Sequence, residues 1–446
     1  MPLTGIQIYK LLPQTNCKEC GFPTCLAFAM KLAAKQVELS SCPYVSEASK
    51  VQLAESAAPP IRLISLKSDG YEVKAGNEVV LFRHEKTFYN KPGIFVKVSD
   101  DQTPDQIKST VAAADAYKVN YVGIDLTMDG FAVASVKGDA ETFKSTVLAV
   151  RQVSKRPLIL MTKDQAVAAA GLSVLSGERP LICGAGPDNW ESMAALAKQH
   201  NANLAIHPGA QQAGSRVEVL AELTEKVKGK GVEDIVLAPE AKSMGEGLAV
   251  ATQIRRLALK KNYRPVGYPV IEFPATPLAA AQAITKYAGF IVLDRFSTEL
   301  AYPLLVLRQN VYTDPQKPIQ VQPGVYEINA PKPEDPLLVT TNFSITYFSV
   351  ANEVEGSGLP AWLLVCDAEG MSVLTAWAAG KFDSERIAKS VREFKCGEKL
   401  SRKRLVIPGA VAVLSGELEA ELPDWEIRVG PREAVDIPAF MRQALK

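Results

Sequence analysis

Eight short apolar runs, each followed by a longer stretch of helical character, occupy the middle of this 446-residue chain. They begin at Ile94, Tyr121, Pro157, Pro180, Asn203, Asp234, Pro269 and Phe290, and IFVKV, PLILM and FIVLD are examples. Apolar runs that alternate with helices are typical of strands buried on both faces of a parallel sheet. Eight such units in about 200 residues predict a closed (β/α)8 barrel. An open doubly wound sheet is the alternative.

Two proline-rich segments divide the chain. Pro59 and Pro60 cannot continue a helix, so residues 57–61 are expected to form a linker. A second linker is expected at residues 322–336, which contain four prolines. The predicted domains are 1–58, the barrel at 59–325, and 326–446. Residues 79–90 precede the first unit and are expected to form a hairpin over the bottom of the barrel.

The third domain repeats the alternation of strands and helices on a smaller scale. We expect strands from Ser344, Ala361, Arg404 and Trp425, and helices from Met371, Ser384 and Ala434. This pattern predicts a small α/β domain with its ligand outside the carboxyl ends of the strands.

Composition excludes several classes of protein. Hydrophobic residues at 47% and charged residues at 22% are those of a soluble globular protein, and a formal charge of +1 gives no bulk attraction to nucleic acid or anionic membrane. The first residues lack the basic and apolar regions of a signal peptide, and no apolar run reaches the ~20 residues of a membrane span. We expect a cytoplasmic protein, in which clustered cysteines bind metal more often than they form disulfides.

Four of the seven cysteines lie close together, as Cys17, Cys20, Cys25 and Cys42, with the spacing C-x2-C-x4-C-x16-C and a proline after the last. Four thiolates fit either zinc or an iron–sulfur cluster. Zinc sites usually pair two C-x2-C hooks, and a proline after a cysteine is common at cluster sites, so a 4Fe-4S cluster is favoured. Zinc and unliganded thiols are the alternatives. The remaining cysteines are isolated, which is typical of small buried side chains.

The order of these domains, together with the segments NCKECGFPTCLAFAMKLA and DAEGMSVLTAWAAGKF, resembles the large (gamma) subunit of the corrinoid iron–sulfur protein of the anaerobic acetyl-CoA (Wood–Ljungdahl) pathway. The resemblance covers the whole chain. It implies a multidomain α/β protein with a small N-terminal 4Fe-4S domain, a central (β/α)8 TIM barrel and a C-terminal flavodoxin/Rossmann-like α/β domain that binds a corrinoid.

The resemblance also implies a function. The chain would be a methyl carrier with no turnover alone: its cobalt(I) corrinoid accepts a methyl group from methyltetrahydrofolate through a methyltransferase and passes it to acetyl-CoA synthase. The 4Fe-4S cluster would reactivate oxidised cobalt(II). The implied partners are a small subunit in a heterodimer, these two enzymes and a low-potential electron donor such as ferredoxin, with neither nucleic acid nor membrane.

A corrinoid needs a flat cradle of backbone groups and short side chains, which glycine turns and small hydroxyl residues supply. For each residue alone, a helix cap or an ordinary turn is an equally good reading. The residues that we expect at the corrinoid are Thr340, Thr346, Gly370, Met371, Ser372, Val373, Leu374, Thr375, Pro408, Gly409, Ala410, Gly430, Pro431 and Ala434.

The positions of the histidines bear on the cobalt. The chain has only His84, His200 and His207, and none lies in the third domain. No imidazole from that domain can therefore bind cobalt. We expect a corrinoid that is both base-off and His-off, with at most water below the metal. The basic run from Lys395 to Arg404 is expected to be a solvated face.

Polar residues that end the predicted barrel strands suggest an alternative function. They are Asp125, Asp129, Cys183, His207, Glu240, Glu272 and Asp294. Catalytic groups of barrel enzymes lie at the carboxyl ends of strands, so these residues favour a pterin-dependent methyltransferase with an attached ferredoxin-like domain. Helix caps and strand-end ion pairs explain the same residues more simply.

Overall fold

The computed structural model describes residues 5–33, 37–47, 49–50, 53, 59–82, 85, 88–121, 124–209, 215–313 and 319–444. The chain forms two compact units, Met1–Lys118 with Thr127–Tyr312, and Val119–Leu126 with Thr313–Lys446. The predicted linker at 57–61 lies partly outside the described residues. The predicted domain boundaries stay predictions, and the second one falls within a strand. No described helix is long and apolar enough to cross a membrane.

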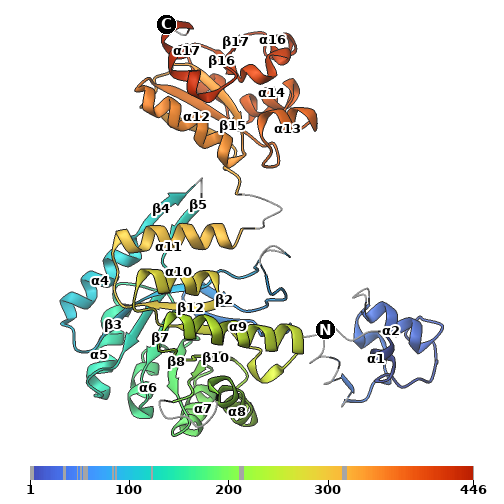
Figure 1. The fold of residues 1–446 in the computed structure, drawn as a ribbon, viewed down its shortest axis with the longest axis vertical. Coiled ribbons are helices and arrows are strands. Elements are labelled where there is room, and N and C mark those ends of the chain that lie inside the picture. Colours follow the sequence, from blue (N-terminus) through green and yellow to red (C-terminus); the bar gives the residue numbers. More distant parts are fainter. Residues whose placement is uncertain are drawn as a thin grey trace. The chain divides into compact units, whose positions relative to one another are not determined.

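The predicted (β/α)8 barrel is confirmed. Eight parallel strands close into a barrel in the order β10-β11-β12-β3-β6-β7-β8-β9. The strands are β3 (Gly93–Ser99), β6 (Gly130–Ala134), β7 (Leu158–Met161), β8 (Leu181–Ala185), β9 (Asn203–Ile206), β10 (Ile235–Leu237), β11 (Val270–Glu272) and β12 (Ala288–Leu293). The helices that follow them are α4 (Pro104–Ala116), α5 (Ala140–Arg151), α6 (Gln165–Leu172), α7 (Trp190–Gln199), α8 (Arg216–Gly229), α9 (Met244–Lys261), α10 (Pro277–Thr285) and α11 (Thr298–Val311). Figure 1 shows these helices around the outside of the sheet.

Local sequence explains where the barrel helices begin. The hydroxyl of Thr103 accepts from the N–H of Gln106, whose side chain accepts in return from the N–H of Thr103. Ser215 and Glu218 form the same reciprocal pair at the start of α8. These capping boxes satisfy N–H groups that the first helical turn leaves unpaired. They mark the βα boundaries that the alternation predicted.

The barrel core also shows what closes its bottom. Inward-facing Phe95, Ile159 and Phe290 pack with Ile64 and Leu66 of the hairpin β1 (Ile64–Ser68) and β2 (Tyr71–Ala75). That hairpin contacts the beginnings of the barrel strands, as where the side chain of Asn203 donates to the carbonyl of Ser65. The hairpin predicted at 79–90 was therefore wrong: no described residue of that range is in a strand.

The predicted second barrel strand, from Tyr121, was also wrong. Residues around it form the hairpin β4 (Lys118–Tyr121) and β5 (Ile124–Thr127), whose side chains are mostly exposed or half-buried. The barrel strand is β6, where a Cβ on Gly130 would lie 2.5 Å from the ring of Phe95 and 2.3 Å from the carbonyl oxygen of Pro157. Glycine is needed there because the backbones and the ring approach closely. A strand that starts on a glycine carries a weak apolar signal.

The described N-terminal residues form a small helical unit. It contains α1 (Gly5–Tyr9), α2 (Cys25–Ala33) and a short 3-10 helix at Leu39–Ser41. The helices approach closely, because a Cβ on Gly5 would lie 2.3 Å from the sulfur of Met30. The core of the unit includes Phe28 and two of the clustered cysteines, Cys25 and Cys42.

The C-terminal domain has a five-stranded sheet in the order β13-β15-β14-β16-β17. The strands are β13 (Gly324–Ile328), β14 (Leu337–Thr341), β15 (Ala361–Cys366), β16 (Arg404–Ile407) and β17 (Glu426–Val429). All pairs are parallel except β13 with β15. β15 lies on one side of β14, and the chain then crosses to β16 on the other side of β14. The switch point of the sheet therefore lies between β14 and β16. This confirms the predicted α/β class.

Helices cover both faces of this sheet (Figure 1). Leu337 and Val339 face a core with α14 (Ser384–Glu393) and α16 (Ser415–Glu421). Leu338 faces the opposite core with α12 (Ser344–Ser357) and α17 (Ile437–Ala444). The alternation of neighbouring side chains between two cores makes each strand apolar throughout.

Two predictions about this domain were wrong. The strand expected from Ser344 is helix α12, and the first parallel strand is β14, which the prolines around it obscured. The second linker at 322–336 contains the edge strand β13. β-branched and aromatic residues made the start of α12 look like a strand, but its packing against the sheet overrides that local preference.

Candidate functional site

A cavity of about 220 Å³ opens at the carboxyl edge of the C-terminal sheet, beside the switch point between β14 and β16. Its walls come from the ends of β14 and β16, from the turn after β17, and from α12 and α17. Open parallel sheets bind their ligands at this place, because the connections diverge and leave a crevice. The predicted location of the ligand site is thus matched by a real cavity.

Eight of the fourteen residues expected at the corrinoid line the cavity: Thr340, Thr346, Val373, Pro408, Ala410, Gly430, Pro431 and Ala434. Thr346 lies there on helix α12, not beside a strand. The other six are not among the lining residues: Gly370, Met371, Ser372, Leu374, Thr375 and Gly409. Three of these, Gly370, Met371 and Ser372, belong to the connection that leads from β15 into the short helix α13 (Val373–Ala378), and Leu374 and Thr375 lie in that helix.

Gly409 has a structural explanation. A Cβ at this position would lie 2.4 Å from the carbonyl oxygen of Gly430 and 2.8 Å from the carbonyl carbon of Pro431. The N–H of Gly409 donates to the carbonyl of Pro431 at 2.9 Å. Glycine therefore lets the turns after β16 and β17 touch, which builds one wall of the cavity.

The cavity contains a buried polar atom that lacks a partner. Thr340 is fully buried and lines the cavity, and its Oγ1 has no hydrogen-bond partner among the described residues. The Oγ1 of the neighbouring Thr341 is also buried and has no hydrogen-bond partner among the described residues. A buried hydroxyl without a partner is costly, so Thr340 fits a ligand that offers it a hydrogen bond. Small side chains and an unpaired hydroxyl fit a ligand that has amide groups.

Exposed apolar side chains follow the carboxyl ends of the strands of this sheet, and the lining of the cavity includes two charged residues, Arg432 and Glu433. Ile345, Leu374, Trp377, Val413 and Val435 are exposed by 42–70% on the same edge of the domain. Arg432 follows Pro431 and lines the cavity, and no described residue forms an ion pair with it. The basic run at 395–404 contributes no lining residue, since Arg404 pairs with Glu426 at the opposite end of the sheet.

Sequence reasoning missed part of this wall. Val350 on α12 and Ile437 and Phe440 on α17 line the cavity. The spacing of Ile437, Phe440 and Met441 is a signal for an apolar helix face and could have identified α17 as a wall. Arg432 could have been found as the cation next to the predicted Gly430–Pro431 turn.

The connection after β15 holds the remaining predicted residues. The hydroxyls of Ser372 and Thr375 lie 3.0 Å apart. Glu369 and Gly370 both have positive φ, at 54° and 74°. Two consecutive residues in this region make a sharply turned loop, which Gly370 adopts without strain. The loop and the first turn of α13 carry short hydroxyl side chains, but these side chains are not among the residues that line the cavity.

The four clustered cysteines lie in the N-terminal unit. Cys25 and Cys42 are buried, Cys20 is half-buried and packs against the same core, and Cys17 is exposed. The N–H of Asn16 donates to Sγ of Cys25 at 3.4 Å. No three His, Cys, Asp or Glu side chains in the described part of the chain lie close enough together to hold a metal ion.

The donor set nonetheless fits a cluster, because four thiols lie on the segment from Cys17 to Cys42 and three of them pack in or against one small core. Asn16, Lys18 and Gly21 all have positive φ, so the segment turns back on itself repeatedly. Metal ligands of small domains usually come together only on binding. The four-thiol site remains a prediction.

The carboxyl edge of the barrel holds five of the seven polar residues named above. Asp294 pairs with Lys97, and Nδ1 of His207 lies 3.5 Å from Glu240. Burial raises the pKa of Cys183 to about 12 and that of Glu272 to about 7, and burial lowers the pKa of His207. The Cys183 thiol and the His207 ring are therefore mainly neutral at pH 7, and the buried Nε2 of His207 has no hydrogen-bond partner among the described residues.

The other two polar residues were misplaced. Asp125 belongs to the β4–β5 hairpin, outside the barrel. Asp129 precedes β6, where its carboxylate accepts from the N–H of Ile94 at 2.8 Å and pairs with Arg308. It lies at the amino end of the strands, whereas the catalytic groups of barrel enzymes lie at the carboxyl end.

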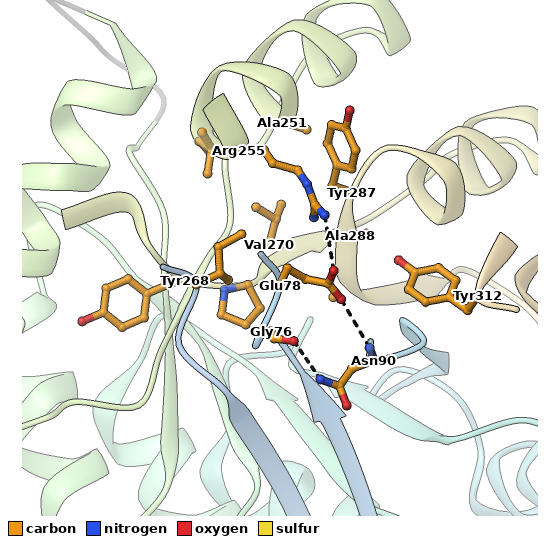
Figure 2. Close-up of a pocket in the computed structure, with 14 residues that line it drawn as sticks. Gly76, Glu78, Asn90, Ala251, Arg255, Tyr268, Val270, Tyr287, Ala288 and Tyr312 are labelled. Carbon is orange, nitrogen blue, oxygen red and sulfur yellow. Dashed lines mark hydrogen bonds and ion pairs between the residues drawn. The ribbon is translucent and has the colours of Figure 1, made fainter. Parts of the chain in front are cut away.

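A second, much smaller cavity of about 30 Å³ lies beside the barrel and has room for about one water molecule. Figure 2 shows the carboxylate of Glu78 between Arg255 of α9 and the backbone of Asn90. The guanidinium of Arg255 lies over the rings of Phe88 and Tyr287, 4.7 and 4.4 Å from their centres. The ion pair fastens this segment to the barrel and leaves no room for a substrate.

Comparison with known proteins follows this geometry. A family described as the CO dehydrogenase/acetyl-CoA synthase delta subunit matches residues 64–441, and a family described as a putative Fe-S cluster matches residues 12–44, which include all four clustered cysteines. The corrinoid/iron-sulfur protein large subunit of Moorella thermoacetica is 44% identical over 100% of both chains. The acetyl-CoA decarbonylase/synthase complex subunit gamma of Archaeoglobus fulgidus is 33% identical over 98% of this chain and 97% of its own. The chain therefore belongs to the family of corrinoid/iron-sulfur protein large subunits and their gamma-subunit relatives.

Proposed function

We propose that this chain is the methyl-carrying subunit of a corrinoid iron–sulfur protein in the anaerobic acetyl-CoA pathway. The observation that carries the proposal is the cavity at the switch point, together with the unpartnered hydroxyl of Thr340 in its wall. The names of the full-length relatives support the same cofactors. The chain acts as a carrier and not as an enzyme with turnover of its own.

The residues of the C-terminal domain would hold the corrinoid in distinct ways. The cavity would receive an apolar part of the ligand, because Leu338, Val350 and Phe440 line it. Thr340 Oγ1 would hydrogen-bond to the ligand, and Arg432 at the mouth would pair with its phosphate. The exposed apolar rim would exclude water from the ring. When bound, the corrinoid supplies a low-valent cobalt that accepts a methyl group and releases it.

The ligand would receive no nitrogen donor from this domain. No histidine occurs after His207 in the chain, and apart from the charged Arg432 and Glu433 the residues that line the cavity offer hydroxyl, backbone and apolar groups. A metal that lacks a strong lower ligand is easier to reduce. The base-off, His-off state is therefore part of the proposal.

The N-terminal unit would hold a 4Fe-4S cluster through Cys17, Cys20, Cys25 and Cys42. The cluster would return an electron to cobalt that has been oxidised. Cys17 is exposed, so a cluster bound there would have one edge at the surface of the unit, where a ferredoxin-like donor can approach.

The partners follow from the names of relatives. A large subunit implies a small subunit, and a methyl carrier needs a methyl donor enzyme and an acceptor, which we propose to be a methyltetrahydrofolate-dependent methyltransferase and acetyl-CoA synthase. The alternative, a pterin-dependent barrel methyltransferase, is less well supported, because Asp125 and Asp129 lie away from the carboxyl edge and Cys183 is held protonated.

The test is the metal content and spectrum of the protein purified with its small subunit without oxygen. We expect cobalt at about one per chain and iron and sulfide at about four each. Cys20→Ala should lose iron and sulfide and keep cobalt, whereas the matched control Cys183→Ala, in the barrel, should keep all three. Stoichiometric zinc in place of iron, or the absence of cobalt, would refute the proposal.

Electron paramagnetic resonance of the cobalt(II) protein tests the lower ligand. We expect a cobalt signal without three-line nitrogen splitting, since no nitrogen ligand is provided. Observation of that splitting would end the base-off, His-off part of the proposal while leaving the carrier function intact.

A further inference from the structure

The side chain of Asn342, buried at the carboxyl end of β14, joins three segments of the C-terminal domain. Its amide nitrogen donates to Oε1 of Gln320 at 3.3 Å and to Oδ1 of Asp367 at 3.1 Å. Its amide oxygen accepts from the N–H groups of Ala368 at 2.9 Å and Gly370 at 3.0 Å. A carboxamide has two N–H donors and two acceptor lone pairs, so all the hydrogen-bonding positions of Asn342 are used.

One of the joined segments is the loop after β15. Asn342 binds the N–H groups on both sides of Glu369, and the N–H of Glu369 donates to Oδ1 of Asp367 at 3.0 Å. The loop continues to Ser372, which begins α13 and contacts Thr375. The amide of Asn342 therefore sets the path of the loop that presents these hydroxyls.

A second joined segment is the stretch that enters the domain ahead of β13. The N–H of Val321 donates to the carbonyl of Asn342 at 2.9 Å, and Gln320 forms an antiparallel bridge with Phe343. The side chain of Gln320 also touches the loop directly, since a Cβ on Gly370 would lie 2.7 Å from its Nε2. The entering segment and the loop thus share one buried hub.

We propose that Asn342 is a positioning residue that couples the segment entering the C-terminal domain, at Gln320 and Val321, to the loop after β15, which leads to Val373 in the lining of the cavity. The coupling to the corrinoid rests on the function proposed above. Such coupling is reciprocal. If docking of the entering segment changes the affinity of the domain for its ligand, then ligand binding changes the equilibrium constant for docking of the segment by the same factor.

The chemistry at position 342 is restrictive. Leucine has a similar size but leaves the N–H groups of Ala368 and Gly370 without a partner, which is costly in a buried place. Aspartate keeps the acceptors but loses both donors and brings a second carboxylate beside Asp367. Like charges this close cannot both be ionised without strong repulsion, which raises the pKa of the pair.

The first experiment measures hydrogen exchange of the full-length chain with and without corrinoid. Gln320→Ala should make the loop amides at 368–371 exchange about tenfold faster, as expected when a supporting hydrogen bond is lost. The matched control is Gln322→Ala, two residues away, where the side chain is exposed and has no hydrogen-bond partner among the described residues. Corrinoid should slow exchange of the Val321 amide in the unsubstituted protein, and slow it less in Gln320→Ala.

The second experiment uses a rescue. Asn342→Asp should shift the visible spectrum of the bound corrinoid and make corrinoid retention depend on pH, with retention weaker as the second carboxyl ionises. The double variant of Asn342→Asp with Asp367→Asn restores one carboxylate and one carboxamide in contact, so it should return both the spectrum and the pH profile toward the original. A purely structural role of Asn342 would lower stability without a pH-dependent spectrum.

The outcomes separate this proposal from the proposed function. Loop exchange in the ligand-free chain does not need corrinoid, so a chain that never binds corrinoid still reports the coupling. If Gln320→Ala leaves loop exchange as unchanged as Gln322→Ala does, or if the double variant fails to restore the spectrum of a stably folded protein, the coupling is refuted even when cobalt is present.

Discussion

The barrel and the C-terminal domain are both built on parallel strands, and the two sheets differ at the edge where their strands end. In the barrel, several polar side chains at that edge meet one another: Lys97 pairs with Asp294, and Nδ1 of His207 lies beside Glu240, although the buried Nε2 of His207 has no hydrogen-bond partner in the described structure. In the C-terminal domain, the edge holds a cavity of about 220 Å³ and a buried hydroxyl, on Thr340, that lacks a partner in the described structure.

The difference teaches where to look for a ligand. A set of titratable groups at the end of a barrel resembles an active site, but Asp294 and Glu240 already have side-chain partners there. An unsatisfied polar atom in a mostly apolar cavity is the stronger sign, because binding removes a cost that the free protein carries. The following substitutions test this contrast.

The largest effect should come from filling the cavity. Ala410→Trp places a large ring among the lining side chains, and we expect corrinoid affinity to fall by about a hundredfold, near the upper end of what overpacking costs. Val136→Trp, at an exposed position on the carboxyl edge of the barrel, should leave affinity unchanged. Cobalt content after gel filtration measures both. Equal retention in the two variants would contradict the contrast.

The stability of the barrel should depend on pH, because a carboxyl group is buried in it. Glu272 ends β11 and has no hydrogen-bond partner in the described structure, and burial raises its pKa to about 7. The folded barrel therefore keeps a proton that the unfolded chain releases at lower pH. Stability is fully present below the ordinary pKa of glutamate and should fall by roughly 2 kcal/mol as the pH rises to 7 and above.

Thermal unfolding between pH 4 and 8 tests that expectation. Glu272→Gln should abolish this part of the pH dependence and raise stability at pH 8. Glu222→Gln, at an exposed helical position paired with Lys226, should not. A pH profile that Glu272→Gln leaves unaltered would show that the carboxyl is ionised and paired in the folded protein.

Thr340→Val should act in opposite directions on the two states. Valine has nearly the same shape and no hydroxyl, so the ligand-free domain should gain about 1 kcal/mol of stability while corrinoid affinity falls severalfold. Denaturant unfolding and corrinoid titration measure the two effects. A loss of stability in the ligand-free protein would mean that the hydroxyl already has a partner, and the contrast with the barrel would weaken.

The smallest effect concerns the cation at the mouth. Arg432→Ala should weaken corrinoid retention a few-fold and make retention less sensitive to salt, as expected for an exposed ion pair with a phosphate. Arg428→Ala is the matched control, because that side chain pairs with Glu426 on the same strand. If both variants respond alike to salt, Arg432 is not at the phosphate.

Sequence reasoning succeeded where burial on both faces makes a strand continuously apolar. Seven of the eight barrel strands were located in this way, and the eighth was missed because β6 begins with Gly130, whose role depends on the distant ring of Phe95. A contact of this kind leaves no local pattern. The start of α12 was misread for the opposite reason, since its residues favour a strand and only the sheet beneath them enforces a helix.

The candidate site was predicted in outline. Turns with Pro408, Gly430 and Pro431 were found because small and rigid residues after a strand indicate a turn near a ligand. Apart from Thr346, the lining residues on α12 and α17 were not predicted, because a helix face becomes a wall of the cavity only through the topology that brings it to the switch point. The hub at Asn342 was invisible for the same reason: its partners lie 22 to 28 residues away along the chain.

The antiparallel strand β13 has a consequence for anyone who wishes to produce the C-terminal domain alone. A cut between residues 325 and 326 would remove the first two residues of that strand and the segment at Gln320 and Val321. The outer side of β15, an apolar central strand, would then present unpaired N–H and C=O groups. Exposed apolar edges of this kind recruit other chains. A fragment that starts at 319 keeps the edge covered and is the better choice for expression.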